Sequence, residues 1–137
     1  MAQEIQVADL RLGKRTFQSK NVDVAVAVSG LTTLMELTPV ADLVRVFFQI
    51  DVADNALDAF QIQGKFHEDG AYQALYSAAA DFTTPEGLLV GASGDLTTQG
   101  AGTTGWFVLE VRGLKALRVQ ASANTGISTV TAFACGG

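Results

Sequence analysis

The stretch 106–121, which begins at Trp106, places the strongest constraint on the fold of this chain. Its apolar residues form two strand-like runs on either side of Gly113, and its charged residues occupy only alternating or terminal positions. A pattern with a period of two residues is typical of a strand that has one buried face. We therefore expect the two runs to form a hairpin about the Gly113 corner, in the middle of a sheet.

The same period recurs earlier in the chain. Residues 22–28 carry Val at every second position, and 31–37 continue the alternation beyond Ser29-Gly30, which predicts a second hairpin. Residues 42–52 form the clearest single strand. Its predicted core face holds the following side chains: Val44, Val46, Phe48, Ile50 and Val52. Phe47 lies on the opposite, polar face, which predicts either cover by a loop or partner, or a singly exposed ring.

The second half of the chain is less regular. Residues 57–66 alternate with Phe60, Ile62 and Phe66 on one side, and Gly64 predicts a bulge. Residues 71–80 fit a short helix or an irregular strand. Residues 83–105 are rich in Gly, Ser and Thr and predict one long loop, with its glycines in 87–105, interrupted by a short strand at 88–90. The last strand is predicted at 126–133, with Ile127 and Phe133 on one face and Val130 and Ala132 on the other.

These elements define the fold class. Seven or eight strands, regular turn signals and at most one short helix predict an all-β fold, an antiparallel β-sandwich or jelly roll. The 137 residues suit one domain. We divide them into an N-terminal arm or edge segment, 1–21, and a β-sandwich domain, 22–137. The arm is either a solvated terminus or a segment that docks on a neighbour.

Composition excludes several classes of partner. A net charge of -5 disfavours nucleic acid, whose phosphates require clustered Lys and Arg. No apolar run approaches the roughly 18 residues of a membrane span, so no membrane partner is expected. The first ten residues lack the pattern of a secretory signal. The lone Cys135 cannot form an internal disulfide, as in a chain that folds in a reducing cytoplasm.

No catalytic motif stands out, so we expect no enzyme, cofactor or metal. Nucleophilic catalysis usually needs a His base, and the single His67 lies in a polar turn. The sequence Gly91-Ala92-Ser93-Gly94 is one residue short of a nucleophile elbow and is interpreted as a turn. The 87–105 loop has no basic residue to hold a phosphate. One Cys and one His cannot build a structural zinc site.

Two further features leave alternatives open. Four oxygen-bearing residues that could hold calcium cluster in one turn, where solvated acids are the expected interpretation: Asp51, Asp54, Asn55 and Asp58. Trp106 follows the glycine-rich loop at a strand end. We expect its indole in the core, and a ligand platform for stacking sugars is the alternative.

Most of the chain resembles the small β-rich structural proteins of tailed bacteriophages, and the capsid decoration, or cement, protein is the nearest type. The pattern that carries the resemblance combines a short basic arm, Val- and Thr-rich strands, a Gly-Thr loop and the closing sequences 108–119 and 126–131. The resemblance implies a protein of the virion, assembled in the host cytoplasm, that forms a homo-oligomer, with a trimer favoured. It implies the major capsid protein as partner.

Under this hypothesis the contacts to the capsid or a neighbouring subunit involve basic residues and one ring: Arg11, Lys14, Arg15, Lys20, Phe47, Arg112, Lys115 and Arg118. The last three cluster near the Gly113 corner and could contact an acidic partner. Two alternatives remain. One is a carbohydrate-binding β-sandwich that uses Trp106 and the 87–105 loop, and the other is a phage tail or neck structural protein.

Overall fold

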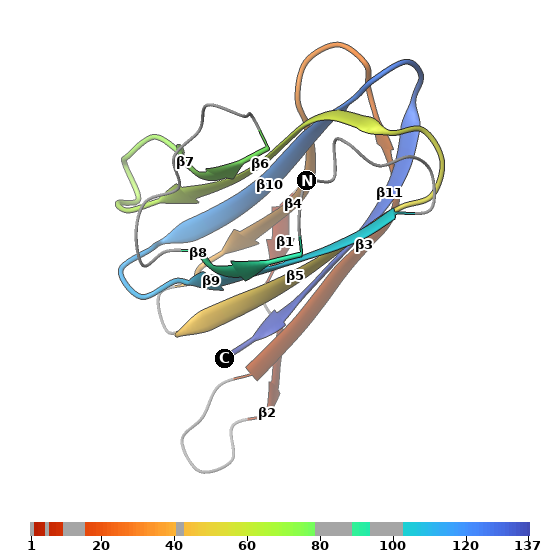
Figure 1. The fold of residues 1–137 in the computed structure, drawn as a ribbon. Helices are drawn as coiled ribbons and strands as arrows, with labels where there is room; N and C mark the ends of the chain where they lie inside the picture. The colour runs from red at the N-terminus through yellow and green to blue at the C-terminus, as the bar shows by residue number, and fades with distance from the viewer. Residues whose placement is uncertain (1, 5, 10–15, 41–42, 79–88, 94–102) are drawn as a thin grey trace.

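Two β-sheets face each other in the computed structural model (Figure 1). The structure describes residues 2–4, 6–9, 16–40, 43–78, 89–93 and 103–137. The five-stranded sheet contains, in spatial order, β1 (Ala2–Glu4), β4 (Thr32–Thr38), β10 (Ala116–Ala123), β6 (Leu57–Lys65) and β7 (Gln73–Ser77). The six-stranded sheet contains β2 (Gln6–Asp9), β3 (Thr16–Val26), β11 (Ser128–Gly136), β5 (Arg45–Val52), β9 (Thr103–Glu110) and β8 (Leu89–Ala92).

The chain winds between the sheets in a jelly-roll order. From β3 to β6, each strand lies in the sheet opposite to the strand before it, and β9, β10 and β11 repeat this alternation. The result is the spatial order β3-β11-β5-β9 facing β4-β10-β6-β7, in which all the neighbouring strands are antiparallel. This order confirms the predicted all-β sandwich and selects the jelly-roll alternative. The short strand β1 differs, because it pairs parallel with β4.

The described residues contain no helix, and therefore none that is long and apolar enough to cross a membrane. The alternatives for 71–80 are a short helix and an irregular strand. The described residues 71–78 contain a strand, β7, so the strand is the correct alternative there. β7 is an irregular strand, because its register against β6 shifts between Ile62 and Gln63. The predicted strand at 88–90 is represented by β8.

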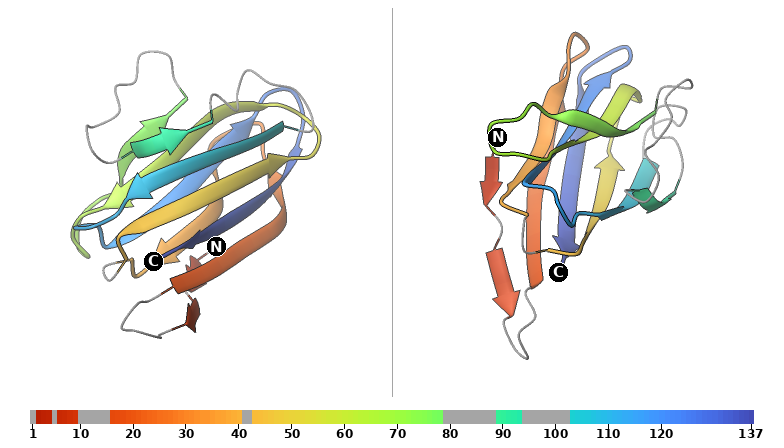
Figure 2. Two further views of the ribbon diagram at one scale, coloured as in Figure 1. Left: turned by 60° about the horizontal axis from the view of Figure 1, so that its bottom comes forward. Right: turned by 90° about the vertical axis from the view of Figure 1, so that its left-hand side faces the viewer.

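Both predicted hairpins are wrong. β9 and β10 flank the Gly113 corner, but β9 pairs with β5 and β8 while β10 pairs with β4 and β6. In the same way, β3 and β4 flank Gly30 and lie in different sheets. Each corner therefore connects one sheet to the other at an end of the sandwich, as Figure 2 shows. Val111 and Leu114 are buried on either side of the Gly113 corner, so this connection covers one end of the core.

The valine alternation of β3 is interrupted by a bulge. Val24 and Val26 face the core as predicted, whereas Val22 and Val28 are exposed. Asp23 has a positive φ of 52°, and the register of β3 against β11 shifts next to it. The bulge reverses the inward face, because N-terminal to it the buried ring is Phe17, at an odd position. Six residues of the segment 1–21 thus belong to β3, which begins at Thr16.

The core lies between the sheets, and aromatic rings from β6, β7 and β9 meet in it. The Phe60 and Phe107 rings stack with centroids 5.0 Å apart, and the Tyr76 ring lies 5.1 Å from Phe107. These rings join the two sheets. Gly64 does not mark a bulge in the ladder with β10. Instead it leaves room for a buried side chain, because a Cβ there would lie 2.6 Å from the Leu75 Cδ1 atom.

Two residues predicted on core faces are exposed, Val44 and Phe66. Val44 precedes the first residue of β5, and Phe66 follows the last residue of β6. The alternation of a strand holds only while the strand is paired, so both side chains lie beyond the edge of the core.

Candidate functional site

Outward side chains of the six-stranded sheet form rows that run across its strands. Phe133 on β11 pairs with Lys20 on β3 and with Gln49 on β5, and Gln49 pairs with Trp106 on β9. These four residues therefore make one row. The next row consists of Gln18, Cys135, Phe47, Val108 and Gly91.

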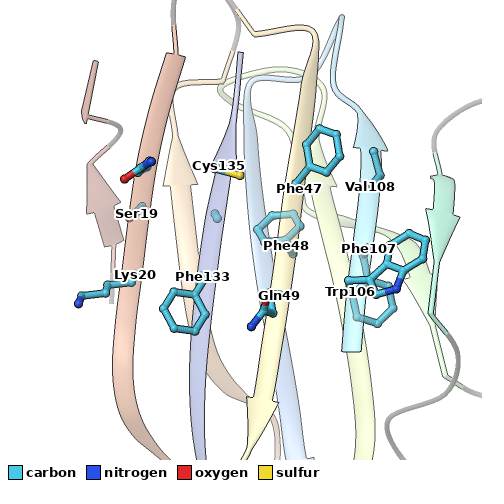
Figure 3. Close-up of a pocket in the computed structure, with 12 residues that line it drawn as sticks. Ser19, Lys20, Phe47, Phe48, Gln49, Trp106, Phe107, Val108, Phe133 and Cys135 are labelled. Atoms are coloured by element: carbon cyan, nitrogen blue, oxygen red, sulfur yellow. The ribbon is translucent and has the colours of Figure 1, made fainter. Parts of the chain in front are cut away.

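Apart from Gly91, the residues of these two rows line an open groove with a volume of about 820 Å³ (Figure 3). Three aromatic rings project from different strands into it. Trp106 is 49% exposed, Phe47 is 47% exposed and Phe133 is 36% exposed. Their neighbours in sequence, Phe48 and Phe107, point to the other side of the sheet and are buried. We refer to this surface as the aromatic groove.

Trp106 does not lie in the core, and the prediction that it does is wrong. Its backbone N–H donates to the Ser93 hydroxyl at 2.8 Å, and its carbonyl accepts from the Ser93 N–H at 2.9 Å. The indole lies over Gly91, where an added Cβ would be 3.3 Å from the ring. Ser93, directly after β8, thus fixes the Trp106 backbone, and Gly91 in β8 supports the ring, which also lines the groove.

The polar groups of the groove lie beside the rings. The Gln49 side-chain amide donates to the Asp51 carboxylate at 3.2 Å. Asp51 pairs with Thr131 on β11 and with Thr104 on β9, which places a third, polar row next to the aromatic ones. Lys20 is exposed at the β3 end of the groove.

The turn that contains Asp54 and Asn55, for which calcium binding is the alternative, forms hydrogen bonds within the protein. Asp54 accepts the Thr129 N–H at 2.6 Å and the Asn55 N–H at 2.9 Å, and the Asn55 side chain donates to the Ile127 carbonyl. The Thr129 hydrogen bond is the main cause of a lowered pKa of Asp54. These bonds tie the β5–β6 turn to β11. No group of three or more His, Cys, Asp or Glu in the described part of the chain is arranged to hold a metal.

The basic residues proposed as contacts are dispersed. Arg11, Lys14 and Arg15 lie outside the described residues. Lys20 and Phe47 share the aromatic groove with Trp106. Arg112, Lys115 and Arg118 lie outside the groove.

Arg112 lies at the exposed corner after β9, where its Nε donates to Glu110 at 2.6 Å. Arg45 donates to the same carboxylate at 3.2 Å, and the two arginines, Arg112 first, lower the pKa of Glu110. Lys115 is exposed beyond the corner. Arg118 is on the outer face of the five-stranded sheet, with its guanidinium 4.1 Å from the Tyr72 ring centroid. Only Arg112 and Lys115 therefore stay together at the corner.

The residues inspected for nucleophilic chemistry do not converge. Gly91 and Ala92 are part of β8 and not of a turn, and the Ser93 hydroxyl accepts the Trp106 N–H. His67 lies in an exposed turn after β6, where its Nδ1 accepts the Asp69 N–H at 3.0 Å.

Sequence reasoning did not select Phe133, Gln49 or Cys135 for the site. The alternation in β11 carried the signal for two of them, because Val130, Ala132 and Ala134 are buried and the intervening side chains must point outward. What the pattern could not give was the order of the strands, which brings β11 beside β5.

The fold and the site define a jelly-roll β-sandwich with an aromatic groove on one outer face. Comparison with solved structures supports the fold. The chain is similar to the SPBc2 prophage-derived protein YomS, with 14% identity, a TM-score of 0.52 and coverage of 88% of this chain and 94% of YomS.

Two adhesin domains of Lys-gingipain also match. The K2 domain has 13% identity, a TM-score of 0.49 and coverage of 98% of this chain and 84% of its own. The K3 domain, from Porphyromonas gingivalis w83, has 13% identity, a TM-score of 0.45 and coverage of 90% and 74%. No protein-family model and no curated protein matches the sequence.

Proposed function

We propose that this protein is a structural component of a tailed-phage virion that decorates and stabilises the capsid. In this role it assembles in the host cytoplasm as a homo-oligomer, with a trimer favoured, and docks on the major capsid protein. It needs no catalytic centre for this function. The phage origin of YomS, whose fold is similar, supports the proposal, as does the use of jelly rolls in viral capsid proteins.

The observation that carries the proposal is an apolar cluster at one end of the sandwich. Val28 and Leu31 are exposed on the β3–β4 corner, and Ile127 is 63% exposed on the β10–β11 corner. We call these three residues the corner cluster. Exposed apolar side chains that lie close together are typical of a protein interface.

Hydrogen bonds join the corners that carry the corner cluster. The Ala123 N–H donates to the Ala27 carbonyl at 2.8 Å, which ties the β10–β11 corner to the β3–β4 corner. The Asn55 side chain donates to the Ile127 carbonyl at 2.9 Å, which adds the β5–β6 turn. The two corners lie side by side in both Figures 1 and 2. A surface fixed in this way can dock with little loss of conformational entropy.

The opposite end of the sandwich carries exposed basic side chains. Arg112 and Lys115 are exposed there at the Gly113 corner, on a chain whose net charge is -5. A local positive region on an acidic protein can orient it toward an acidic partner. We assign the apolar corner cluster to contacts between subunits, and Arg112 and Lys115, together with Arg11, Lys14 and Arg15, to the capsid surface.

The test measures oligomeric mass and capsid binding separately. Light scattering of the purified protein should give the mass of a trimer, and Ile127→Asp should reduce it to that of a monomer. Phe66→Asp is the matched control, because Phe66 is 50% exposed outside the corner cluster. A parent protein that is monomeric at all accessible concentrations would contradict the oligomer.

Capsid binding is tested by co-sedimentation with capsids. Removal of residues 1–15 deletes three of the basic residues together with the short edge strands β1 and β2, and it spares β3, whose Phe17 is buried in the core. The truncated protein should stay folded and lose capsid binding. Full binding would overturn the assignment. Immunogold labelling of virions separates the head from the alternative tail or neck position.

A further inference from the structure

We propose that the aromatic groove binds a carbohydrate, an oligosaccharide of pyranose rings, with Trp106 as the stacking platform. Gln49 and Asp51 supply the hydrogen bonds. This inference does not depend on the virion assignment, because it concerns a different surface from the corner cluster and the Gly113 corner.

The first argument is the preorganisation of Trp106. Its backbone N–H and carbonyl are both bonded to Ser93, and Gly91 leaves room for the ring to rest on β8. About half of the side chain remains exposed. A flat apolar surface that is held in place before binding loses little freedom when a ligand stacks on it.

The second argument is the chemistry that accompanies the indole. A pyranose ring has a face of C–H groups and a rim of hydroxyls, so it is recognised by an aromatic face together with planar polar groups. Gln49 lies in register beside Trp106, and its amide is bonded to Asp51. An amide and a carboxylate together have more donors and acceptors than this bond uses, and hydroxyls can both donate to and accept from them.

The third argument is size. Phe133 and Trp106 lie on the strands that flank β5, so their backbones are about 10 Å apart, twice the spacing of neighbouring strands. The groove volume of about 820 Å³ is within the range of small-ligand sites. A chain of a few sugar rings that lies across the strands can therefore contact both aromatic side chains and Gln49 between them.

The position of Asp51 favours a sugar over a protein as the ligand of this face. This residue lies on β5, in the middle of the sheet, between Thr131 and Thr104. Asp51 lies in the row next to the residues that line the groove, so a flat protein surface placed over the groove and this row would desolvate its carboxylate, and the centres of protein interfaces are depleted in charged residues. A hydroxyl-rich ligand replaces the lost water with hydrogen bonds of its own.

The test uses the full chain on an array of defined bacterial and mammalian glycans, followed by titration calorimetry with the oligosaccharide that binds. We expect Trp106→Ala and Gln49→Ala each to weaken binding about tenfold or more. Phe66→Ala is the matched control, because its ring is equally exposed and lies outside the groove, and it should bind like the parent. Circular dichroism and thermal unfolding confirm that each variant is folded.

Several outcomes would overturn the proposal. One is a parent protein that binds no glycan on the array, and another is a folded Trp106→Ala variant that binds as well as the parent. A third is that Trp106→Ala changes the oligomeric mass or capsid binding, which would make the groove a protein interface. If the glycan binds and the capsid does not, the virion assignment fails and this inference stands.

Discussion

The outer faces of the two sheets differ in how their side chains are used. On the five-stranded sheet, Arg118 stacks on Tyr72 and donates to the Gln63 side chain. Nearby, the Gln120 side chain donates to the Thr33 hydroxyl at 3.0 Å. These long polar side chains bond to one another along the sheet. A face of this kind is already satisfied without a partner.

The six-stranded sheet presents the opposite picture. Its outer face exposes the rings of Trp106, Phe47 and Phe133, and its polar pair is Gln49 with Asp51. Exposed aromatic surface next to a few polar groups is typical of a binding site. The comparison shows that polar side chains bond to one another on one outer face, while the other outer face leaves three aromatic rings exposed, as the proposed glycan site requires.

The largest effect is expected at neighbouring residues of β9, one of which faces the groove and the other the core. Phe107→Ala should lower the free energy of unfolding by about 3–5 kcal/mol, because the ring packs on Phe60 and Tyr76. Trp106→Ala, one residue away, should lower it by about 1 kcal/mol or less, because its ring is half exposed. Urea denaturation followed by circular dichroism measures both. Equal losses would show that Trp106 is a core residue after all.

Gly64 and Gly91, one in each sheet, allow the same comparison between a buried and an exposed neighbour. Gly64→Ala should lower the free energy of unfolding by about 1–3 kcal/mol, because the new Cβ meets the buried Leu75 and Leu114 side chains. At Gly91 the new Cβ meets the exposed Trp106 ring, which can shift, so Gly91→Ala should cost under about 1 kcal/mol. Its effect should instead appear in glycan affinity. Thermal unfolding of both variants and calorimetry of Gly91→Ala check this contrast.

On the five-stranded face, Arg118→Ala should lower the free energy of unfolding by about 1 kcal/mol, because the cation–π contact and the bonds to Gln63 are lost together. The pKa of Tyr72 is raised, first by burial and then by Glu36, and Arg118 opposes this shift. The variant should therefore raise the pKa of Tyr72 further. Titration of tyrosine absorbance measures the change, and Arg112→Ala, which does not contact Tyr72, is the control.

Local sequence pattern predicted most of the strands after residue 21 but not their partners, and it gave no strand within the segment 1–21, which holds β1, β2 and the start of β3. The alternation in 42–52 predicted β5 and its inward Phe48 correctly, because a strand with one buried face must have a period of two. The same alternation on both sides of Gly113 is compatible with a hairpin and with a corner between sheets. The choice is made by long-range pairing of β9 with β5 and of β10 with β6.

The site was less predictable for a related reason. Phe47 was correctly placed on an outer face, because it breaks the polar pattern of its own strand. Trp106 was harder to place, because Phe107 beside it is also aromatic; the contacts that hold Trp106 come from Gly91 and Ser93, within the glycine-rich stretch. The bulge at Asp23 has no sequence signal that we recognised, and it reverses the inward face of β3.

The smallest effect is expected at the end of the six-stranded face, where Glu110 binds two arginines. Hydrogen bonds from Arg112 and then Arg45 lower the pKa of Glu110 from its ordinary value of 4.5. A carboxyl whose pKa is lowered by folding contributes stability that is fully present above its unfolded pKa and is lost as the pH falls through the folded value. Acid unfolding should therefore depend less on pH below about 4.5 in Glu110→Gln than in the parent.

At neutral pH the same variant should be only slightly less stable, because the arginines are largely exposed and water screens the pair. Added salt should reduce the difference further. Since Arg112 is the larger cause of the shift, Arg112→Ala should raise the pKa of Glu110 more than Arg45→Ala does, as measured by carboxyl NMR titration. The reverse order would mean that the ladder between β5 and β9, which aligns Arg45 with Glu110, controls this carboxylate more strongly than the corner does.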